Sequence, residues 1–138
     1  MKKYQGTKVI EAEPMTCDEA LSRGFLPASR RDTLENEGKT DGYHVCYKDG
    51  YESWSTKNVF EETYRPCDTF LDHLHIEYEE LRQRIAKLHT FIDKDEAFAK
   101  LGADDRNILQ TQLHIMNEYL NILSIRIVVA EKKGKANE

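Results

Sequence analysis

The side chains best suited to bind a nucleotide lie at regular spacing in the second half of the chain. Arg84 and Phe91 are seven residues apart with Lys87 between them, and Asn117 and Arg126 lie on a second segment of the same kind. If the two segments pair as antiparallel helices, Arg84 approaches Asn117. An arginine can bind a phosphate through two parallel hydrogen bonds, and an aromatic ring can stack on a base. The pattern therefore fits a site for a small phosphorylated ligand.

The same spacing is typical of the exposed flanks of paired helices, which carry ion pairs such as Glu80 with Arg84. On the pattern alone we favour this second interpretation. Arg65 is likewise interpreted first as a boundary residue of a small β unit. His73 and Glu77 have the i,i+4 spacing of two metal ligands on a helix. We interpret them as part of an exposed polar face.

No motif of a known catalytic centre is present. The sequence lacks the phosphate-binding patterns GxxxxGK[ST] and GxGxxG and the hydrolase patterns HExxH and GxSxG. The three cysteines, Cys17, Cys46 and Cys67, have no CxxC spacing, so we expect free thiols and no zinc site. The sequence therefore predicts a non-enzymatic protein without a metal or cofactor.

The composition limits both the core and the partners. Hydrophobic residues make up 39% of the 138 residues and charged residues 33%, which favours long thin elements or self-association over a large core. A net charge of −5 disfavours binding to polymeric nucleic acid, whereas a few local arginines could still hold a small anion. No apolar run has the roughly 20 residues of a membrane span, and the polar N-terminus does not resemble a secretory signal.

Residues 1–66 are predicted to form a small antiparallel β module with one short helix, which makes the fold class α+β. The capping-box pattern and an Asp-Gly pair between two β-favouring runs are the main signals. The expected elements are a strand Thr7–Glu13 ended by Pro14, a helix Cys17–Ser22 capped by Thr16, a loop 27–41, and a hairpin with strands Tyr43–Lys48 and Tyr51–Trp54.

Residues 67–131 are predicted to form a long antiparallel helical hairpin. Two apolar seams each alternate steps of three and four residues over three heptads, and residues 93–103 reverse the chain between them. We expect Asp68 to cap the first helix and residues 132–138 to form a charged flexible tail. The seams consist of Leu71, Leu74, Tyr78, Leu81, Ile85, Leu88 and Ile92, and of Leu109, Leu113, Met116, Leu120, Leu123, Ile127 and Ala130.

The second helix carries an additional apolar stripe outside its seam. This stripe repeats every seven residues, at Ile108, Ile115, Ile122 and Val129. A hairpin partner covers only one side of a helix, so the stripe needs the β module or a second subunit to cover it. We therefore expect a homo-oligomer.

Both parts of the chain resemble small phage proteins. The segments Tyr4–Ala20 (YQGTKVIEAEPMTCDEA), Gly42–Ser55 and Val59–Arg65 resemble an N-terminal module that is frequent in such proteins. The segments Glu77–Ile92 and Asp104–Ile127 resemble the hairpin shared by two phage sponges. These are the Thoeris anti-defence sponge and the anti-CBASS cyclic-oligonucleotide sponge. A β module followed by this hairpin is the arrangement of the Thoeris sponge.

The resemblance implies a binding protein of the cytoplasm of an infected bacterium. Sponges of this family bind an immune second messenger, a cyclic ADP-ribose isomer for Thoeris, and do not cleave it. They form dimers that assemble into hexamers, and some members also bind cyclic di- or trinucleotides. By position in the motifs, Phe91 would stack on adenine, and Arg65 and Arg126 would hold the pyrophosphate and ribose. The pocket would lie between the β module and hairpins of adjacent subunits, with the seam-edge residues Arg84, Lys87 and Asn117 as further candidates.

Two other functions remain as alternatives. The hairpin could bind a host protein through its additional apolar stripe, or the protein could hydrolyse a nucleotide. A sponge returns intact ligand after heating, a hydrolase returns product, and a host-protein binder shows no nucleotide binding.

Overall fold

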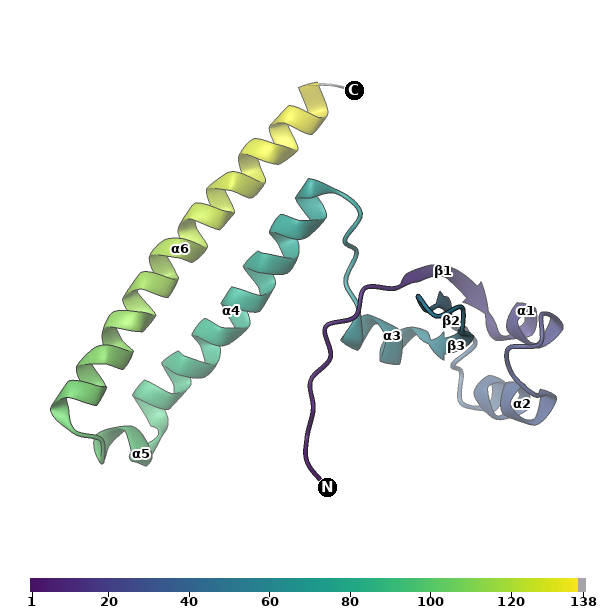
Figure 1. Ribbon diagram of the computed structural model, residues 1–138, viewed down its shortest axis with the longest axis horizontal. Coiled ribbons are helices and arrows are strands. Elements are labelled where there is room, and N and C mark those ends of the chain that lie inside the picture. The colour runs from purple at the N-terminus through teal and green to yellow at the C-terminus, as the bar shows by residue number, and fades with distance from the viewer. Residues whose placement is uncertain (137–138) are drawn as a thin grey trace. The chain divides into compact units, whose positions relative to one another are not determined.

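The chain divides into two units, Met1–Tyr64 and Arg65–Glu138, which we describe separately. The computed structural model describes residues 1–136. The first unit contains a small antiparallel sheet, and the second contains a pair of long helices (Figure 1). The predicted α+β class is confirmed.

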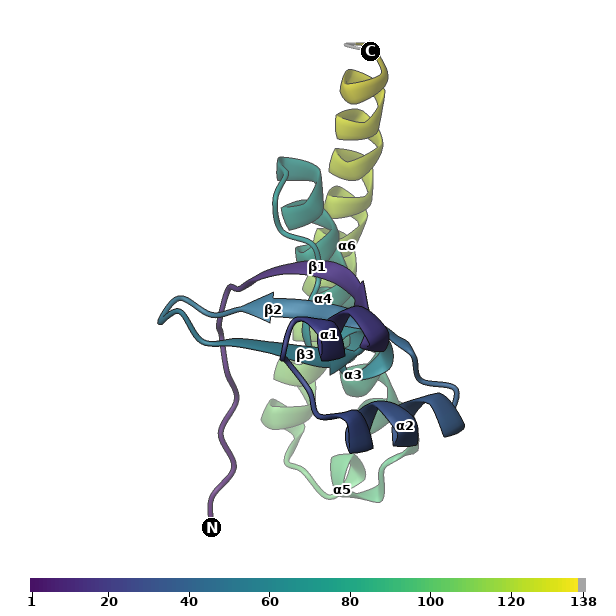
Figure 2. The same ribbon diagram turned by 90° about the vertical axis from the view of Figure 1, so that its right-hand side faces the viewer.

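Three antiparallel strands form the sheet of the first unit, in the order β1-β2-β3 (Figure 2). They are β1 (Glu11–Thr16), β2 (Asp41–Cys46) and β3 (Glu52–Thr56). The predicted hairpin joins β2 and β3. Its turn uses a positive φ of 90° at Gly50, a conformation that glycine adopts without strain. The Asp49 carboxylate accepts the N–H of Tyr51 at 3.0 Å, which closes the turn.

The first strand differs from the sequence-based expectation. We predicted a strand at Thr7–Glu13 ended by Pro14, but β1 begins at Glu11 and contains Pro14, which lies opposite Tyr43. Proline cannot donate a ladder hydrogen bond and is tolerated where a strand has one unpaired side. Since β1 is an edge strand of this sheet, the proline does not end it.

The helices of the first unit depend on caps and on few buried residues. Helix α1 (Cys17–Ser22) has the predicted bounds, and the Thr16 hydroxyl accepts the N–H of Glu19 at 3.3 Å. The loop expected at 27–41 is wrong, because α2 (Ala28–Asn36) occupies most of it. Only Leu34 of α2 is buried, so the helix has almost no amphipathic pattern for the sequence to show. A third helix, α3 (Lys57–Thr63), follows β3.

The second unit is a helical hairpin of α4 (Phe70–Lys94) and α6 (Ala103–Ala136), joined by the short α5 (Glu96–Ala99) (Figure 1). Its most buried side chains are Leu74, Leu123 and Ile127, with other seam residues packed around them. The predicted seams therefore face each other in this core, while the pairing of Ile85 with Met116 stays a prediction.

Both ends of the hairpin differ from the expectation. Thr69, and not Asp68, caps α4: its hydroxyl accepts the N–H of Asp72 at 3.0 Å, and the Asp72 carboxylate accepts the N–H of Thr69 at 3.2 Å. At the other end α6 continues to Ala136, so most of the tail expected at 132–138 is helical, and residues 137–138 lie outside the described part. Helix α6 extends past the start of α4 (Figure 1). No helix in the described residues has the length and apolar character needed to cross a membrane.

Candidate functional site

Phe91 lies at the end of the hairpin where the chain turns. Its half-buried ring packs against Phe98 of α5, with centroids 5.9 Å apart and ring planes at 81°. Asp95, the residue between α4 and α5, accepts the N–H of Ala97 at 2.8 Å. This turn orients the Phe91 ring and leaves part of it accessible to a ligand.

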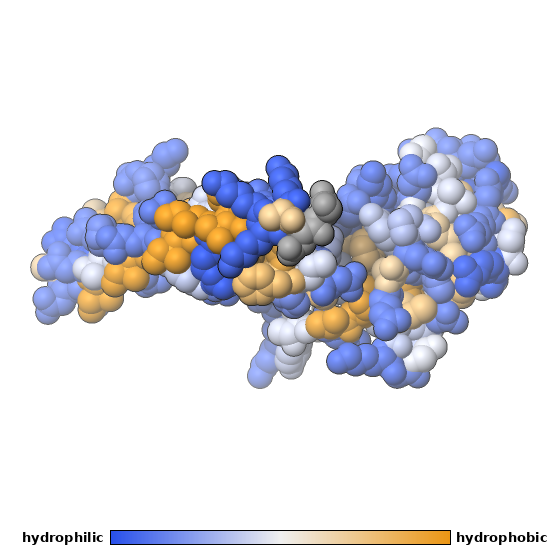
Figure 3. Space-filling view, turned by 90° about the horizontal axis from the view of Figure 1, so that it is seen from above, coloured by the Kyte–Doolittle hydropathy of each residue, from blue (hydrophilic) through white to orange (hydrophobic). Residues whose placement is uncertain are grey.

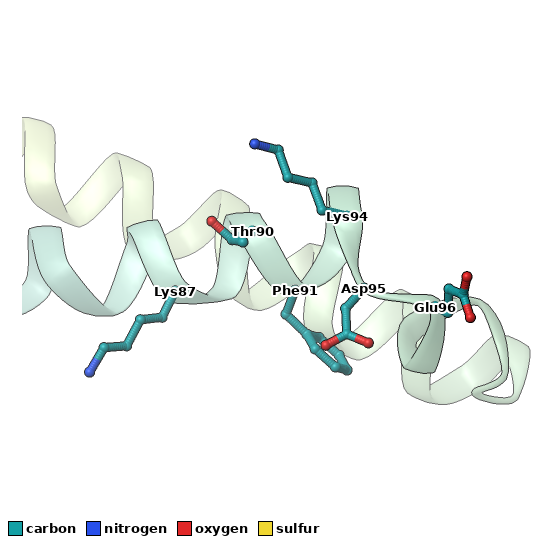
Figure 4. Close-up of a pocket in the computed structure, with 6 residues that line it drawn as sticks. All are labelled: Lys87, Thr90, Phe91, Lys94, Asp95 and Glu96. Carbon is teal, nitrogen blue, oxygen red and sulfur yellow. The ribbon is translucent and has the colours of Figure 1, made fainter.

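A shallow hollow of about 630 Å³ surrounds Phe91. Two of the predicted site residues, Phe91 and Lys87, line it. Phe91 and Asp95 point to one side of α4, whereas Lys94 points to the opposite side (Figure 4). Two lysines and two acidic residues among the lining side chains balance in charge, so the hollow suits a stacked base better than a pyrophosphate. The complete lining is Lys87, Thr90, Phe91, Lys94, Asp95 and Glu96.

A second hollow, of about 260 Å³, contains an arginine that the sequence reasoning missed. Phe98 and Arg106 both line it. The Arg106 Nε atom is buried and has no hydrogen-bond partner. A buried donor without a partner costs free energy, so it is a candidate for binding a ligand acceptor. In the sequence Arg106 follows two aspartates at the start of a helix, which gave no reason to select it.

Arg126 lies at the other end of the hairpin. Its guanidinium carbon is 5.9 Å from the ring centroid of Phe70, which is 66% exposed and is the first residue of α4. Arg65 lies in the segment just before α4 and contributes to the lowered pKa of the Glu79 carboxyl, for which the hydrogen bond from Arg82 is the main cause. Two of the predicted cationic residues thus lie at the end where α4 begins.

The predicted stacking and phosphate-binding residues are therefore far apart within one chain. Phe70, on which Arg126 lies, and Phe91 are both on α4, 21 residues apart. At 1.5 Å per residue this separation is about 30 Å along the helix axis. One small cyclic nucleotide cannot contact Phe91 and Arg126 of the same chain.

Arg84 and Asn117 lie in the middle of the hairpin and are not joined. The Asn117 amide donates to the Leu113 carbonyl of its own helix at 3.1 Å. In the described part of the chain no hydrogen bond connects Asn117 with Arg84. The expected ion pair of Arg84 with Glu80 is not formed there either. These positions stay exposed and available to a ligand.

The additional apolar stripe of α6 is exposed in the single chain. Figure 3 shows apolar side chains, in orange, on the surface that faces the viewer. The exposed fractions are 63% for Ile108, 57% for Ile115, 53% for Ile122 and 43% for Val129. Neither α4 nor α5 covers this stripe, which leaves it free for a partner.

Residues 68–129 match a protein-family model described as Sequestin. The match covers α4, α5 and most of α6, and so includes every predicted site residue except Arg65. No curated protein and no solved structure matched the chain.

Proposed function

We propose that the protein sequesters a cyclic nucleotide second messenger of phage-infected bacteria. The match of its helical hairpin to the Sequestin family model supports this proposal. The family name describes sequestration and not catalysis. The proposed ligand is a cyclic ADP-ribose isomer of the Thoeris type, with CBASS cyclic oligonucleotides as further ligands. Removal of the messenger would leave the host effector inactive.

The observation that carries this proposal is the division of the hairpin into two unlike ends. The Phe91 end has an accessible aromatic ring in a hollow of balanced charge. The other end carries Arg126 beside Phe70, with Arg65 near Glu79. A base needs a stacking surface, and a pyrophosphate needs cations. The two ends together supply what a cyclic dinucleotide-like ligand requires.

The separation of about 30 Å along α4 supports a site that is shared between chains. In an antiparallel dimer of hairpins, the Arg126 end of one chain lies beside the Phe91 end of the other. The exposed stripe Ile108, Ile115, Ile122 and Val129 is the surface that would bury itself in such an assembly. The proposed assembly is a homodimer that forms a hexamer, in which each messenger contacts two chains.

Sequestration requires tight binding, because the protein competes with the host effector. Nanomolar affinity corresponds to a binding free energy of about −12 kcal/mol. A ligand with two phosphates and a stackable base reaches this range only if both charges are paired away from water. A site closed by two chains excludes water better than the shallow hollow of one chain.

The test is to incubate the purified chain with a cyclic ADP-ribose isomer, remove free ligand, and denature the protein by heat. The proposal expects the intact messenger in the supernatant, in molar amounts close to the number of sites. A linearised or cleaved product would identify a hydrolase instead. An absence of bound nucleotide, together with binding to a purified host protein, would favour the interaction-protein alternative.

A further inference from the structure

The sheet of the first unit brings three potential metal ligands together on one face. Alternate residues of a strand point to the same side, so His44 and Cys46 of β2 share a face. The strand register places Glu52 of β3 opposite Cys46 and Glu13 of β1 opposite His44. All three strands therefore contribute to a single cluster, which lies entirely within the first unit.

The ligand atoms of this cluster already have the spacing of a metal site. The His44 Nε2 atom is 3.0 Å from the Glu52 Oε1 atom, and the Cys46 Sγ atom is 3.4 Å from Oε1 and 3.6 Å from Nε2. A tetrahedral zinc ion with bonds of about 2.0–2.3 Å holds such ligands about 3.3–3.6 Å apart. An ion can therefore bind between these three atoms with little movement of the strands.

Both ring nitrogens of His44 face carboxylates. Its Nδ1 atom lies 3.1 Å from Glu13 Oε1, and its Nε2 atom faces Glu52. A neutral imidazole donates from only one nitrogen, so the other nitrogen faces a carboxylate oxygen as acceptor against acceptor. Either an additional proton or a metal ion on Nε2 resolves this conflict. With a metal ion there, Nδ1–H donates to Glu13, which is the usual carboxylate–histidine–metal arrangement.

The surroundings bury the cluster and place several carboxylates around it. His44 is only 5% exposed, and its ring stacks on Phe25 with centroids 4.4 Å apart. Burial, followed by the carboxylates of Glu52, Glu11 and Glu13, raises the pKa of the Cys46 thiol. A divalent cation would compensate the negative charge of these carboxylates.

We propose that His44 Nε2, Cys46 Sγ and Glu52 Oε1 bind one Zn²⁺ ion, with water as the fourth ligand. Glu13 holds His44 in the correct orientation. Binding releases the thiol proton of Cys46 to solvent and forms a zinc–thiolate bond. A nitrogen, sulfur and oxygen ligand set at a tetrahedral site is typical of zinc. The sequence predicted no zinc site, because the three cysteines have no CxxC spacing.

The first experiment uses Co²⁺ as a spectroscopic substitute for zinc. The full chain is stripped with a chelator, exchanged into metal-free buffer and titrated with Co²⁺. We expect one equivalent to bind with a thiolate-to-cobalt charge-transfer band, which added Zn²⁺ abolishes. Cys46→Ser should lose the band, whereas Cys67→Ser, which removes another half-buried thiol outside the cluster, should keep it.

Three further measurements keep the proposal falsifiable if Cys46→Ser does not fold. Glu52→Gln changes a half-exposed side chain and should weaken Co²⁺ binding at least tenfold. Glu13→Gln should retain the band at saturation but weaken binding about 10–100-fold, as expected for a residue that orients a ligand. Zinc should also raise the melting temperature of the wild-type chain. Absence of the band in the wild type, or a band that survives Cys46→Ser, would overturn the proposal. None of these readouts involves a nucleotide, so the result is independent of the proposed sponge function.

Discussion

The indole Nε1 atom of Trp54 donates a hydrogen bond of 2.8 Å to the main-chain carbonyl oxygen of Met15. The two residues lie on β3 and β1, with β2 between them. The indole crosses β2 at Gly42, where a Cβ atom would collide with the Trp54 ring and with the Ser55 carbonyl oxygen. A single side chain thus ties the three strands together, and only glycine leaves room for it.

Gly42→Ala should therefore destabilise the first unit by about 2 kcal/mol or more, because the added methyl group overpacks a position with no free space. Urea unfolding followed by the fluorescence of Trp54, the single tryptophan, reports on this unit directly. Gly6→Ala is the matched control, since no heavy atom lies within 4 Å of its added Cβ atom. Equal unfolding midpoints for the two variants would contradict the close approach.

The pair of Asp18 and Arg31, which connects α1 and α2, should make stability depend on acid pH. The hydrogen bond from Arg31 holds the pKa of the Asp18 carboxyl below its usual value of 3.8. A carboxyl with a lowered pKa contributes stability above its unfolded-state pKa and loses it as the pH falls through the folded-state pKa. Asp18→Asn should therefore lower the unfolding midpoint at neutral pH, and its difference from the wild type should shrink as the pH falls below the usual carboxyl pKa of 3.8.

The expected effect of Asp18→Asn is small, because the pair is exposed to solvent. Glu62→Gln on α3 serves as the control, since it removes an exposed carboxylate elsewhere in the same unit. A difference that stays constant from neutral to strongly acidic pH would show that ionisation of Asp18 is not its source.

Phe91→Ala and Arg126→Ala should each weaken messenger binding at least about tenfold, or roughly 1.4 kcal/mol. The first change removes the stacking ring, and the second removes a cation for the phosphates. Isothermal calorimetry on folded variants gives the affinities, with Arg30→Ala, an exposed arginine of α2, as control. Unchanged affinity in Arg126→Ala together with a loss in Arg106→Ala would place the phosphate near Phe98 instead.

Mixing the two defective variants tests whether each site is shared between chains. A dimer of one Phe91→Ala chain and one Arg126→Ala chain contains one site with both residues intact. Random exchange should thus restore about a quarter of the wild-type sites. Sites built within one chain would give no recovery. Chains unfolded and refolded together ensure that exchange has occurred.

Ile122→Glu should reduce self-association, because it places a charge in the middle of the exposed stripe of α6. Sedimentation at micromolar concentration should show a shift towards the monomer. Val59→Glu is the control, since Val59 has a similar exposed fraction but lies on α3. If the wild-type chain sediments as a monomer at this concentration, the shared-site proposal fails.

The helical hairpin could be predicted because its information is periodic and local. An apolar residue recurs every three or four positions in α4 and α6, and residues of both predicted seams form the core of the helical hairpin. The short elements carried weaker signals. Helix α2 buries only Leu34, and Pro14 predicts a strand end unless the sheet order is known, which makes β1 an edge strand.

The candidate sites were harder to predict, because they depend on contacts between distant residues. The cluster of His44, Cys46 and Glu52 requires the pairing of β2 with β3, and its support by Glu13 requires the register of β1. No spacing along the sequence contains this information. Similarly, Arg126 was selected from the sequence, but the ring of Phe70 beneath it was not.

The extension of α6 past the start of α4 affects how fast an anion is captured. Lys132, Lys133 and Lys135 lie on this extension, at the same end of the hairpin as Arg126. Positive potential there would attract a phosphorylated molecule before contact and raise its association rate, with salt screening the attraction beyond about 8–10 Å. A protein that competes with a receptor for newly made messenger depends on speed of encounter as well as on tightness of binding. The lysines would serve the former, and the aromatic and arginine contacts the latter.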